Sequence, residues 1–197
     1  MNYLGHFYLA HLTHTSYQGA LLGDFVRGKR WQDYQSAEQL GILLHRTLDG
    51  WIDQWTIDSG INALFNAALR RFAPIALDLY WDYQLASRWS EFEAIPLQQF
   101  AEHVYHSLKP QAMPTRAQET AQNMTEHNWL GHYQQPDFIL RALKRISERM
   151  NHKLPYQALS EALWAQELKL RQQFDQLMRM IPILAPQWQE KIAQTKL

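Results

Sequence analysis

The chain has 197 residues, 46% of them hydrophobic, which is enough for one domain with a sizeable core. It contains no cysteine, so a disulfide framework, a zinc finger and a thiol nucleophile are excluded. Lys plus Arg and Asp plus Glu number 19 each, and this balance argues against general nucleic-acid binding. The first residues lack the basic segment of a signal peptide, and no segment approaches about twenty uninterrupted apolar residues. We therefore expect a cytoplasmic protein that binds neither nucleic acid nor membrane.

Hydrophobic residues recur at helical spacing along nearly the whole chain, and no convincing strand alternation is present. Asn2 and Ser16 are predicted N-caps, and Ser36 with Gln39 is a predicted capping box. Prolines stand between the periodic segments, where helices begin or end. In chain order, the expected helices cover residues 3–12, 16–28, a segment starting at 36, 56–71, 74–89, 96–108, 115–132, 136–150 and 155–180, with a short last helix beyond prolines 182 and 186. The sequence thus predicts an all-α protein, a single compact domain over residues 1–197 with about eight to ten helices.

The stretch GILLHRTLDGWID pairs His45 with Asp49 inside an apolar helical pattern. Four residues make about one helical turn, so the imidazole and the carboxylate project from the same face. A buried charge without a partner is costly. The two side chains therefore either satisfy each other or hold a metal ion.

Other polar residues are embedded in apolar helices within the first 82 positions, namely His6, Asp24, Asp78 and Asp82. Histidine nitrogen combined with aspartate oxygen suits Mn²⁺, Fe²⁺ or Zn²⁺. Metal sites in helical bundles are built when several helices each contribute one or two inward ligands. Each residue also has an ordinary structural interpretation, such as a hydrogen-bonded core histidine or an ion pair, and helical spacing alone does not show that the helices converge.

Basic residues accompany these candidate ligands. Arg46 directly follows His45, and Arg27 follows Asp24 by nearly one turn. Guanidinium groups clamp phosphate oxygens, so both arginines are candidates for binding a substrate phosphate. A second basic row, Arg141, Arg145 and Arg149, is either a solvated helix face or a docking surface for an acidic partner. No P-loop, dinucleotide-binding or nucleophile-elbow motif is present.

Four blocks of sequence resemble the acyl carrier protein phosphodiesterase family: NYLGHFYLA, GALLGDFVRG, GILLHRTLD and APIALDLYWDYQLA. They run in order through the first ninety or so residues, and the later helices match that family only loosely. The resemblance implies an all-helical fold distantly related to the HD-domain phosphohydrolases. It also implies a divalent metal, typically Mn²⁺, with Mg²⁺, Co²⁺ or Fe²⁺ as alternatives. No adjacent His-Asp dyad occurs in the chain, so the HD-type ligand set does not transfer.

Enzymes of this family remove 4′-phosphopantetheine from holo-acyl carrier protein, and the resemblance therefore implies a cytoplasmic phosphodiesterase of fatty acid biosynthesis. By position, it places Asp24, His45, Asp49 and Asp82 at or near the metal, together with His6 and Asp78. Arg46, with Arg27 as a second candidate, would neutralise the phosphate, and an aspartate that does not bind the metal would act as general base. Because the carrier protein is acidic, it is expected to dock on the 27–30 loop or the 141–149 face. The alternatives are hydrolysis of a small phosphoester or nucleotide, and a non-catalytic helical binding module.

Overall fold

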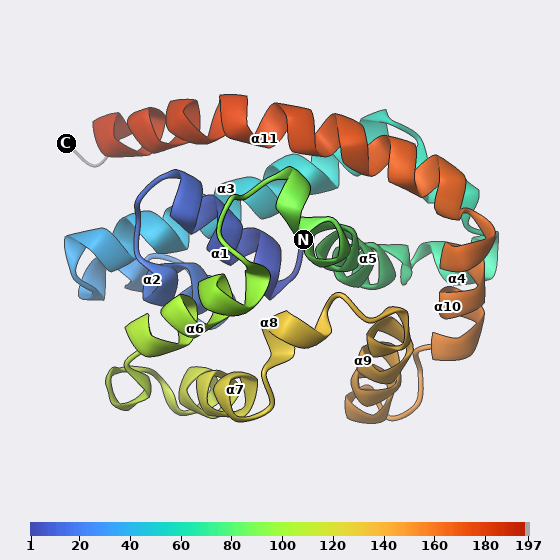
Figure 1. Ribbon diagram of the computed structural model, residues 1–197, viewed down its shortest axis with the longest axis horizontal. Helices are drawn as coiled ribbons and strands as arrows, with labels where there is room; N and C mark the ends of the chain where they lie inside the picture. The colour runs from blue at the N-terminus through green and yellow to red at the C-terminus, as the bar shows by residue number, and fades with distance from the viewer. Residues whose placement is uncertain (196–197) are drawn as a thin grey trace.

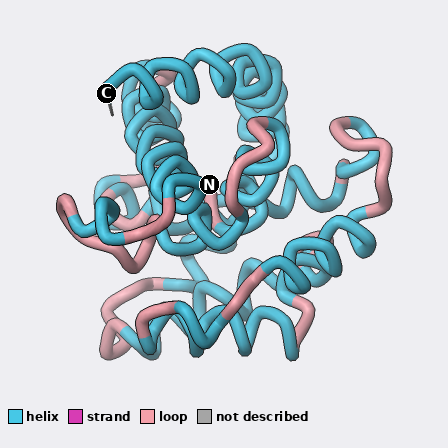
Figure 2. Tube along the Cα trace, turned by 90° about the vertical axis from the view of Figure 1, so that its left-hand side faces the viewer, coloured by secondary structure: helices cyan, strands magenta, loops and turns pink. Residues whose placement is uncertain are grey.

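The computed structural model describes residues 1–195, and within that range the chain forms only helices, turns and loops (Figure 1, Figure 2). This confirms the all-α prediction. The α-helices of the described chain are α1 (Tyr3–Leu12), α2 (Tyr17–Leu22), α3 (Ser36–Asp58), α4 (Ala67–Arg70), α5 (Ala73–Ser87), α6 (Leu97–Ser107), α7 (Thr115–Glu126), α8 (Trp129–His132), α9 (Pro136–Arg149), α10 (Tyr156–Ala165) and α11 (Glu167–Thr195). Short 3₁₀ helices lie in the connections at Arg30–Asp33, Ile61–Leu64, Trp89–Glu91 and Pro110–Ala112.

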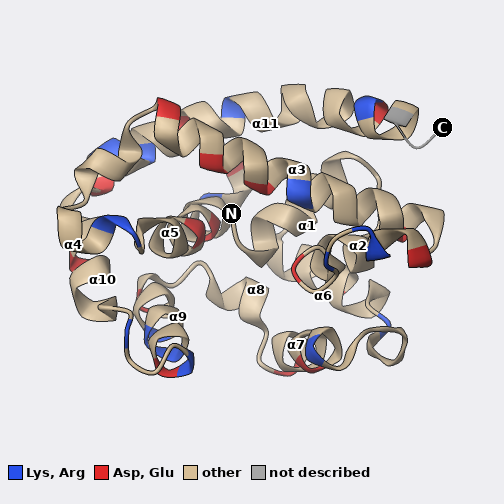
Figure 3. Ribbon diagram, turned by 180° about the vertical axis from the view of Figure 1, so that it is seen from behind, with Lys and Arg blue, Asp and Glu red and all other residues tan. Residues whose placement is uncertain are grey.

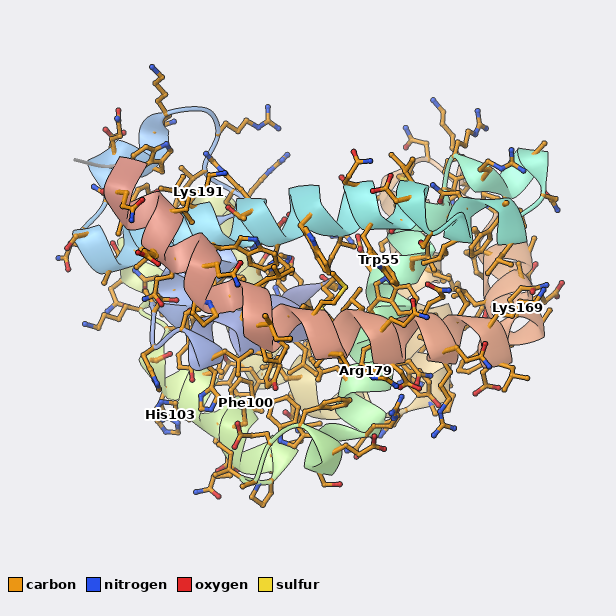
Figure 4. All side chains as sticks on the ribbon, turned by 90° about the horizontal axis from the view of Figure 1, so that it is seen from above. Trp55, Phe100, His103, Lys169, Arg179 and Lys191 are labelled. Atoms are coloured by element: carbon orange, nitrogen blue, oxygen red, sulfur yellow. The ribbon has the colours of Figure 1, made fainter. Side chains whose placement is uncertain are left out.

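The two longest helices, α3 and α11, run along one side of the molecule and pack against each other (Figure 1, Figure 4). Trp51 of α3 fixes part of this contact, since its ring centroid lies 5.6 Å from that of Trp188 on α11. In Figure 1, α1 and α5 lie in the middle, and α6 to α9 form the opposite side. The N-terminus is central in this view, whereas α11 ends at one edge of the molecule.

Helix α5 is the centre of the core. Four consecutive residues, Leu79 to Asp82, are buried, and four residues cover a complete helical turn, so α5 is covered on all sides. Its Trp81 and Tyr80 are among the largest side chains that are fully buried. The core therefore surrounds a helix that carries Asp82. A carboxylate buried in this way needs hydrogen-bond partners.

Helices α2 and α3 pack backbone against backbone, because glycines face each other at their contact. A Cβ atom added to Gly41 would lie 2.8 Å from the Ser16 oxygen and 2.9 Å from the Gly19 Cα. A Cβ atom on Gly19 would lie 2.5 Å from the Glu38 oxygen. Only glycines allow this approach, and it brings the end of α2 beside the middle of α3.

Several predicted helix boundaries are wrong. The predicted 16–28 helix ends at Leu22, and the predicted 56–71 helix is replaced by the end of α3, a 3₁₀ turn and the short helix α4. The predicted 115–132 helix is interrupted at Asn128, whose φ of 43° is left-handed. The predicted 155–180 helix is divided into α10 and α11.

The two late prolines do not end a helix, as the sequence suggested, but lie inside α11. Pro182 and Pro186 are four residues apart on the exposed side, while Ile181 and Ala185 are buried on the packed side. Packing of that side maintains the helix although each proline removes a backbone hydrogen bond.

The helix starts also differ in detail. The capping box of α3 is formed by Gln35 and Glu38, one residue earlier than predicted. Ser16 caps α2 as predicted, accepting a bond from the Gly19 amide at 3.0 Å.

Among the described residues, no helix is both long enough and apolar enough to cross a membrane.

Candidate metal centre

His45 lies in the middle of α3 and is buried, with 3% of its surface exposed. Its Nδ1 is 2.7 Å from the carbonyl oxygen of Ala20 on α2, so this nitrogen carries the proton and donates it. The Nε2 atom then points to two carboxylates, at 3.4 Å from Asp24 and 3.1 Å from Asp49. Burial acts to lower the pKa of His45, but the hydrogen bonds to Asp24 and Asp49 outweigh it and raise the pKa to about 9.

His6 approaches the same place from α1. Its ring stacks on that of His45, with centroids 3.5 Å apart and planes inclined by 12°. Its Nε2 lies 3.1 Å from Asp49. Burial, followed by the neighbouring His45, lowers the pKa of His6 to about 4, so this imidazole is neutral. A neutral imidazole is the form that binds metal ions.

Asp49 connects the two histidines, since one of its oxygens faces His6 and the other faces His45. Burial acts to raise its pKa, but the hydrogen bonds from His45 and His6 hold it well below its usual range. Asp24, in the turn after α2, is held in the same way by His45, and its pKa is lowered. Both carboxylates are close to half exposed, so the cluster is open on their side.

The local sequence around Asp24 is adapted to the His45 ring. A Cβ atom on Gly23 would lie 2.2 Å from Cγ of His45, which leaves no room for any side chain. Glycine at this position lets the turn after α2 pass over the imidazole and place the next residue, Asp24, beside it. The role of Gly23 depends on its contact with His45 of α3. The two residues are far apart in the sequence, so their spacing could not reveal the contact.

A cavity of about 240 Å³ opens beside the cluster, and its wall is strongly acidic. Asp24 and Asp49 contribute to it together with Asp53 and Asp78. Figure 3 shows acidic segments of α3 and α5 close to the N-terminus. Asp53 was missed in the sequence, although it follows Asp49 by one helical turn and so lies on the same face. Such a concentration of negative charge favours a cation.

The structure places Asp82 apart from this cluster. It is completely buried and accepts bonds from the backbone amides of Asn2, Leu4 and Gly5, at 3.1, 2.7 and 3.0 Å. It therefore caps the N-terminus of α1, a role that the sequence had given to Asn2, whose side chain makes no capping bond. Burial raises the pKa of Asp82 to about 7, against the effect of the terminal amine and these amides.

Asp78, one turn before Asp82, accepts a bond from the Met1 amino group at 2.8 Å. It lines the acidic cavity but lies outside the group of atoms that converge on Asp49. The two aspartates of α5 thus hold the start of α1, which carries His6. Their effect on the cluster is to position one of its histidines.

The two predicted phosphate ligands differ in their surroundings. Arg46 donates to the carbonyl oxygens of Val26 and Gly28, the former by a short bond and the latter at 2.8 Å. Its guanidinium therefore ties the loop after α2 to α3. Arg27 lies on this loop with an exposed side chain. The loop is thereby held against the helix that carries His45.

The arrangement fits a divalent metal. One atom each from His6, His45 and Asp49 lies within 4.8 Å of the others, and Asp24 provides a further carboxylate. The bond from His45 Nδ1 to a backbone carbonyl is the usual outer support of a metal-binding histidine, because it leaves Nε2 for the ion. Two imidazoles and carboxylate oxygen suit Mn²⁺, Fe²⁺, Co²⁺ or Zn²⁺. Fold and site thus define an all-helical protein with an acidic cavity competent to hold a divalent cation.

Comparison with known proteins gives the family. A family model described as acyl carrier protein phosphodiesterase matches residues 1–181. The chain belongs to the acyl carrier protein phosphodiesterase family. A relative of that name from Klebsiella pneumoniae (strain 342) is 35% identical over 152 residues, which is 76% of this chain and 79% of the relative. One from Yersinia pestis is 31% identical over 196 residues, covering 97% of this chain and 99% of the relative.

The similarity is more extensive than the sequence blocks suggested, since the family model continues well beyond the first ninety residues. A third relative, from Escherichia coli O139:H28, has the same name and is 34% identical over 153 residues, which is 76% of this chain and 79% of the relative. No solved structure matches the chain. The proposed relation to HD-domain proteins therefore stays a prediction.

Proposed function

We propose that this protein is a metal-dependent phosphodiesterase that hydrolyses 4′-phosphopantetheine from holo-acyl carrier protein and leaves the apo form. The convergence of His6, His45 and Asp49 in an acidic cavity is the observation that supports this chemistry. Membership of the acyl carrier protein phosphodiesterase family supports the substrate. The protein is accordingly a phosphoric diester hydrolase.

In this proposal His6, His45 and Asp49 hold Mn²⁺, with Asp24 as a fourth ligand or as the base; Mg²⁺, Co²⁺ and Fe²⁺ are alternatives. When bound, such an ion polarises a diester oxygen and lowers the pKa of a coordinated water. The Ala20 carbonyl fixes the His45 ring so that Nε2 faces the cavity. Because the pKa of Asp24 is lowered, this carboxylate is ionised at neutral pH and able to accept a proton from the attacking water.

Hydrolysis adds water across the bond between phosphorus and the serine oxygen. The hydroxyl group joins phosphorus, the serine oxygen leaves and takes up a proton, and 4′-phosphopantetheine departs as a monoester. Arg27, exposed on the loop after α2, is proposed to neutralise the phosphate, whereas Arg46 holds that loop through Val26 and Gly28. Asp82 is proposed to act only by positioning α1.

We further propose that this reaction takes place in the cytoplasm and serves the carrier protein of fatty acid biosynthesis. The absence of cysteine is compatible with a reducing compartment. The substrate is a protein, so a basic surface on this chain is expected to bind it.

The test is to incubate the purified protein with holo-acyl carrier protein and Mn²⁺ and to weigh the carrier protein by mass spectrometry. The expected result is loss of the phosphopantetheine mass, abolished by a chelator and by His45→Ala. His103→Ala is the matched control, because His103 is exposed on α6 and belongs neither to the cluster nor to the lining of the acidic cavity. An unchanged carrier mass with a metal-loaded protein, or hydrolysis of nucleotides alone, would contradict the proposal.

A further inference from the structure

A second cavity, of about 780 Å³, lies between α9 and the helices α1, α5, α7 and α8, and the proposed reaction leaves it without a role. Its volume is within the range of small-molecule sites, roughly 300–1,000 Å³. One part of its wall is aromatic, with Trp129 of α8 and Phe138 of α9. Another part is formed by the arginine row of α9, Arg141, Arg145 and Arg149.

This cavity adjoins the candidate metal centre. Asn2 lines both cavities, and the next residue, Tyr3, lines the large one. Burial raises the pKa of Tyr3, Asp24 raises it further, and Arg149 acts to lower it, so the phenol lies within electrostatic reach of both the cluster and the arginine row. The two cavities therefore meet at Asn2, and Tyr3 lies beside it on the side of the large cavity.

The lining combines apolar surface with hydrogen-bond donors. The three arginines are spaced over eight residues of α9, which corresponds to about 12 Å along the helix. The guanidinium groups supply hydrogen-bond donors and positive charge along this part of the wall. The occupant expected here is a slender, elongated molecule with apolar segments and carbonyl acceptors.

We propose that this cavity binds the pantetheine arm of the substrate, with its phosphate end beside Asn2 and Tyr3. The inference rests on the proposed function, since it assigns the place of the part of the substrate that is not hydrolysed. The dimethyl segment and methylene groups of the arm pack on Trp129 and Phe138. Its two amide carbonyls accept from donors of the arginine row. Binding energy from the arm then positions the diester at the cluster.

The test fills the cavity from two different helices. Ala142→Trp on α9 and Thr120→Trp on α7 each introduce an indole at a lining position. Leu140→Trp is the matched control, because Leu140 is 40% exposed on α9 and outside the lining. Binding of 4′-phosphopantetheine and of inorganic phosphate to the Mn²⁺-loaded protein is measured by calorimetry, and hydrolysis of holo-acyl carrier protein is followed by mass spectrometry. Circular dichroism and Mn²⁺ affinity check each variant's fold.

The unmodified protein and Leu140→Trp are expected to bind phosphopantetheine at least tenfold more tightly than phosphate. Both filling variants are expected to reduce this preference to below threefold and to raise KM for holo-carrier protein at least tenfold, with Mn²⁺ affinity unchanged. Filling variants that fold and still prefer phosphopantetheine would overturn the proposal; the arginine row would then contact the carrier protein alone. If the unmodified protein hydrolyses no holo-carrier protein, the proposed function fails, and phosphopantetheine binding still decides the assignment of the cavity.

Discussion

Asp49 is the residue on which the candidate metal centre depends most, because its two oxygens each face one of the stacked histidines. Asp49→Asn removes the charge and one acceptor while keeping the size of the side chain. We expect Mn²⁺ affinity to fall at least 100-fold, more than the loss typical of outer-shell partners. Asp53→Asn, in the same cavity but outside the cluster, is expected to lose less than tenfold. Electron paramagnetic resonance of free Mn²⁺ measures both, and equal losses would place the ion elsewhere.

His45 links the site to stability when no metal is bound. Its pKa of about 9 in the folded protein exceeds the ordinary value of 6.5, so the folded state binds a proton more tightly than the unfolded state. This contribution is complete below pH 6.5 and is lost as the pH rises through 9, and it amounts to ~3 kcal/mol at most. The lowered pKa values of His6 and Asp49 add no slope in this window, because both contributions are complete above pH 6.5.

Urea unfolding of metal-free protein between pH 6.5 and 9 tests this expectation. The free energy of unfolding should fall across the window, and it should fall less steeply in His45→Gln, where the raised pKa values of Asp82 and of the Met1 amine account for the slope that is left. A profile of the unmodified protein that is flat, or that rises with pH, would show that Asp24 and Asp49 do not stabilise the protonated form of His45.

Only some residues of the candidate site could be identified from the sequence. The spacing of His45 and Asp49 predicts that they share a helix face, and the structure confirms it. The Ala20 carbonyl and Gly23 could not be found, since both act across the α2–α3 contact. A buried aspartate looks the same in a sequence whether it holds a cation or backbone amides, so Asp82 was grouped with the candidate metal ligands.

At the scale of the helices, the close α2–α3 contact determines whether the site forms. Gly41→Ala would push α2 from α3, because its Cβ atom would lie 2.8 Å from the Ser16 oxygen. We expect a loss of about 1–3 kcal/mol in unfolding free energy and weaker Mn²⁺ binding, as the Ala20 carbonyl moves from His45. Gly50→Ala is the control on the same helix, with nothing within 4 Å, and is expected to be neutral or stabilising. Equal behaviour of the two variants in thermal unfolding would exclude this role of the contact.

Helix α1 depends on Asp82 in a comparable way. Asp82→Asn replaces one carboxylate oxygen by an amide group, which cannot accept from a backbone N–H. At least one buried donor of α1 then loses its acceptor, at a cost of about 1–3 kcal/mol. Urea midpoints should therefore fall, whereas Asp58→Asn, at the exposed end of α3, should leave them unchanged. If Asp82→Asn lowered Mn²⁺ affinity without changing the midpoint, Asp82 would be a ligand rather than a cap.

Helix positions along the chain were mostly predictable, and their ends were not. Prolines 74, 96 and 136 lie at or near helix starts, as expected from their missing amide. Prolines 182 and 186 carry the same signal but lie within α11, because burial of Ile181 and Ala185 on its other side sustains the helix. Local sequence signals mispredict the end of a helix where tertiary packing determines it. The break between α7 and α8 at Asn128 is a further boundary that these signals did not predict.

For the whole molecule, the zero net charge conceals a separation of charges. Acidic side chains gather around the candidate metal centre, while arginines follow α9 along the larger cavity (Figure 3). Net charge from the sequence could not show this, although the spacing of the arginines indicated one shared face. If the larger cavity binds the pantetheine arm as proposed, the arginine row forms a basic rim beside the place where the arm enters.

Charge reversal on this rim tests the arrangement. Arg145→Glu is expected to reduce kcat/KM for holo-carrier protein about tenfold at low salt, through a higher KM, because electrostatic attraction to the acidic partner is replaced by repulsion. Raising the ionic strength to 0.5 M should shrink the difference from the unmodified protein, since exposed charges are then screened over a few ångströms. Lys144→Glu makes the same change of charge beside the cavity rather than in its lining, and a smaller effect is expected. A loss in kcat that is independent of salt would instead mean that Arg145 acts at the reacting diester.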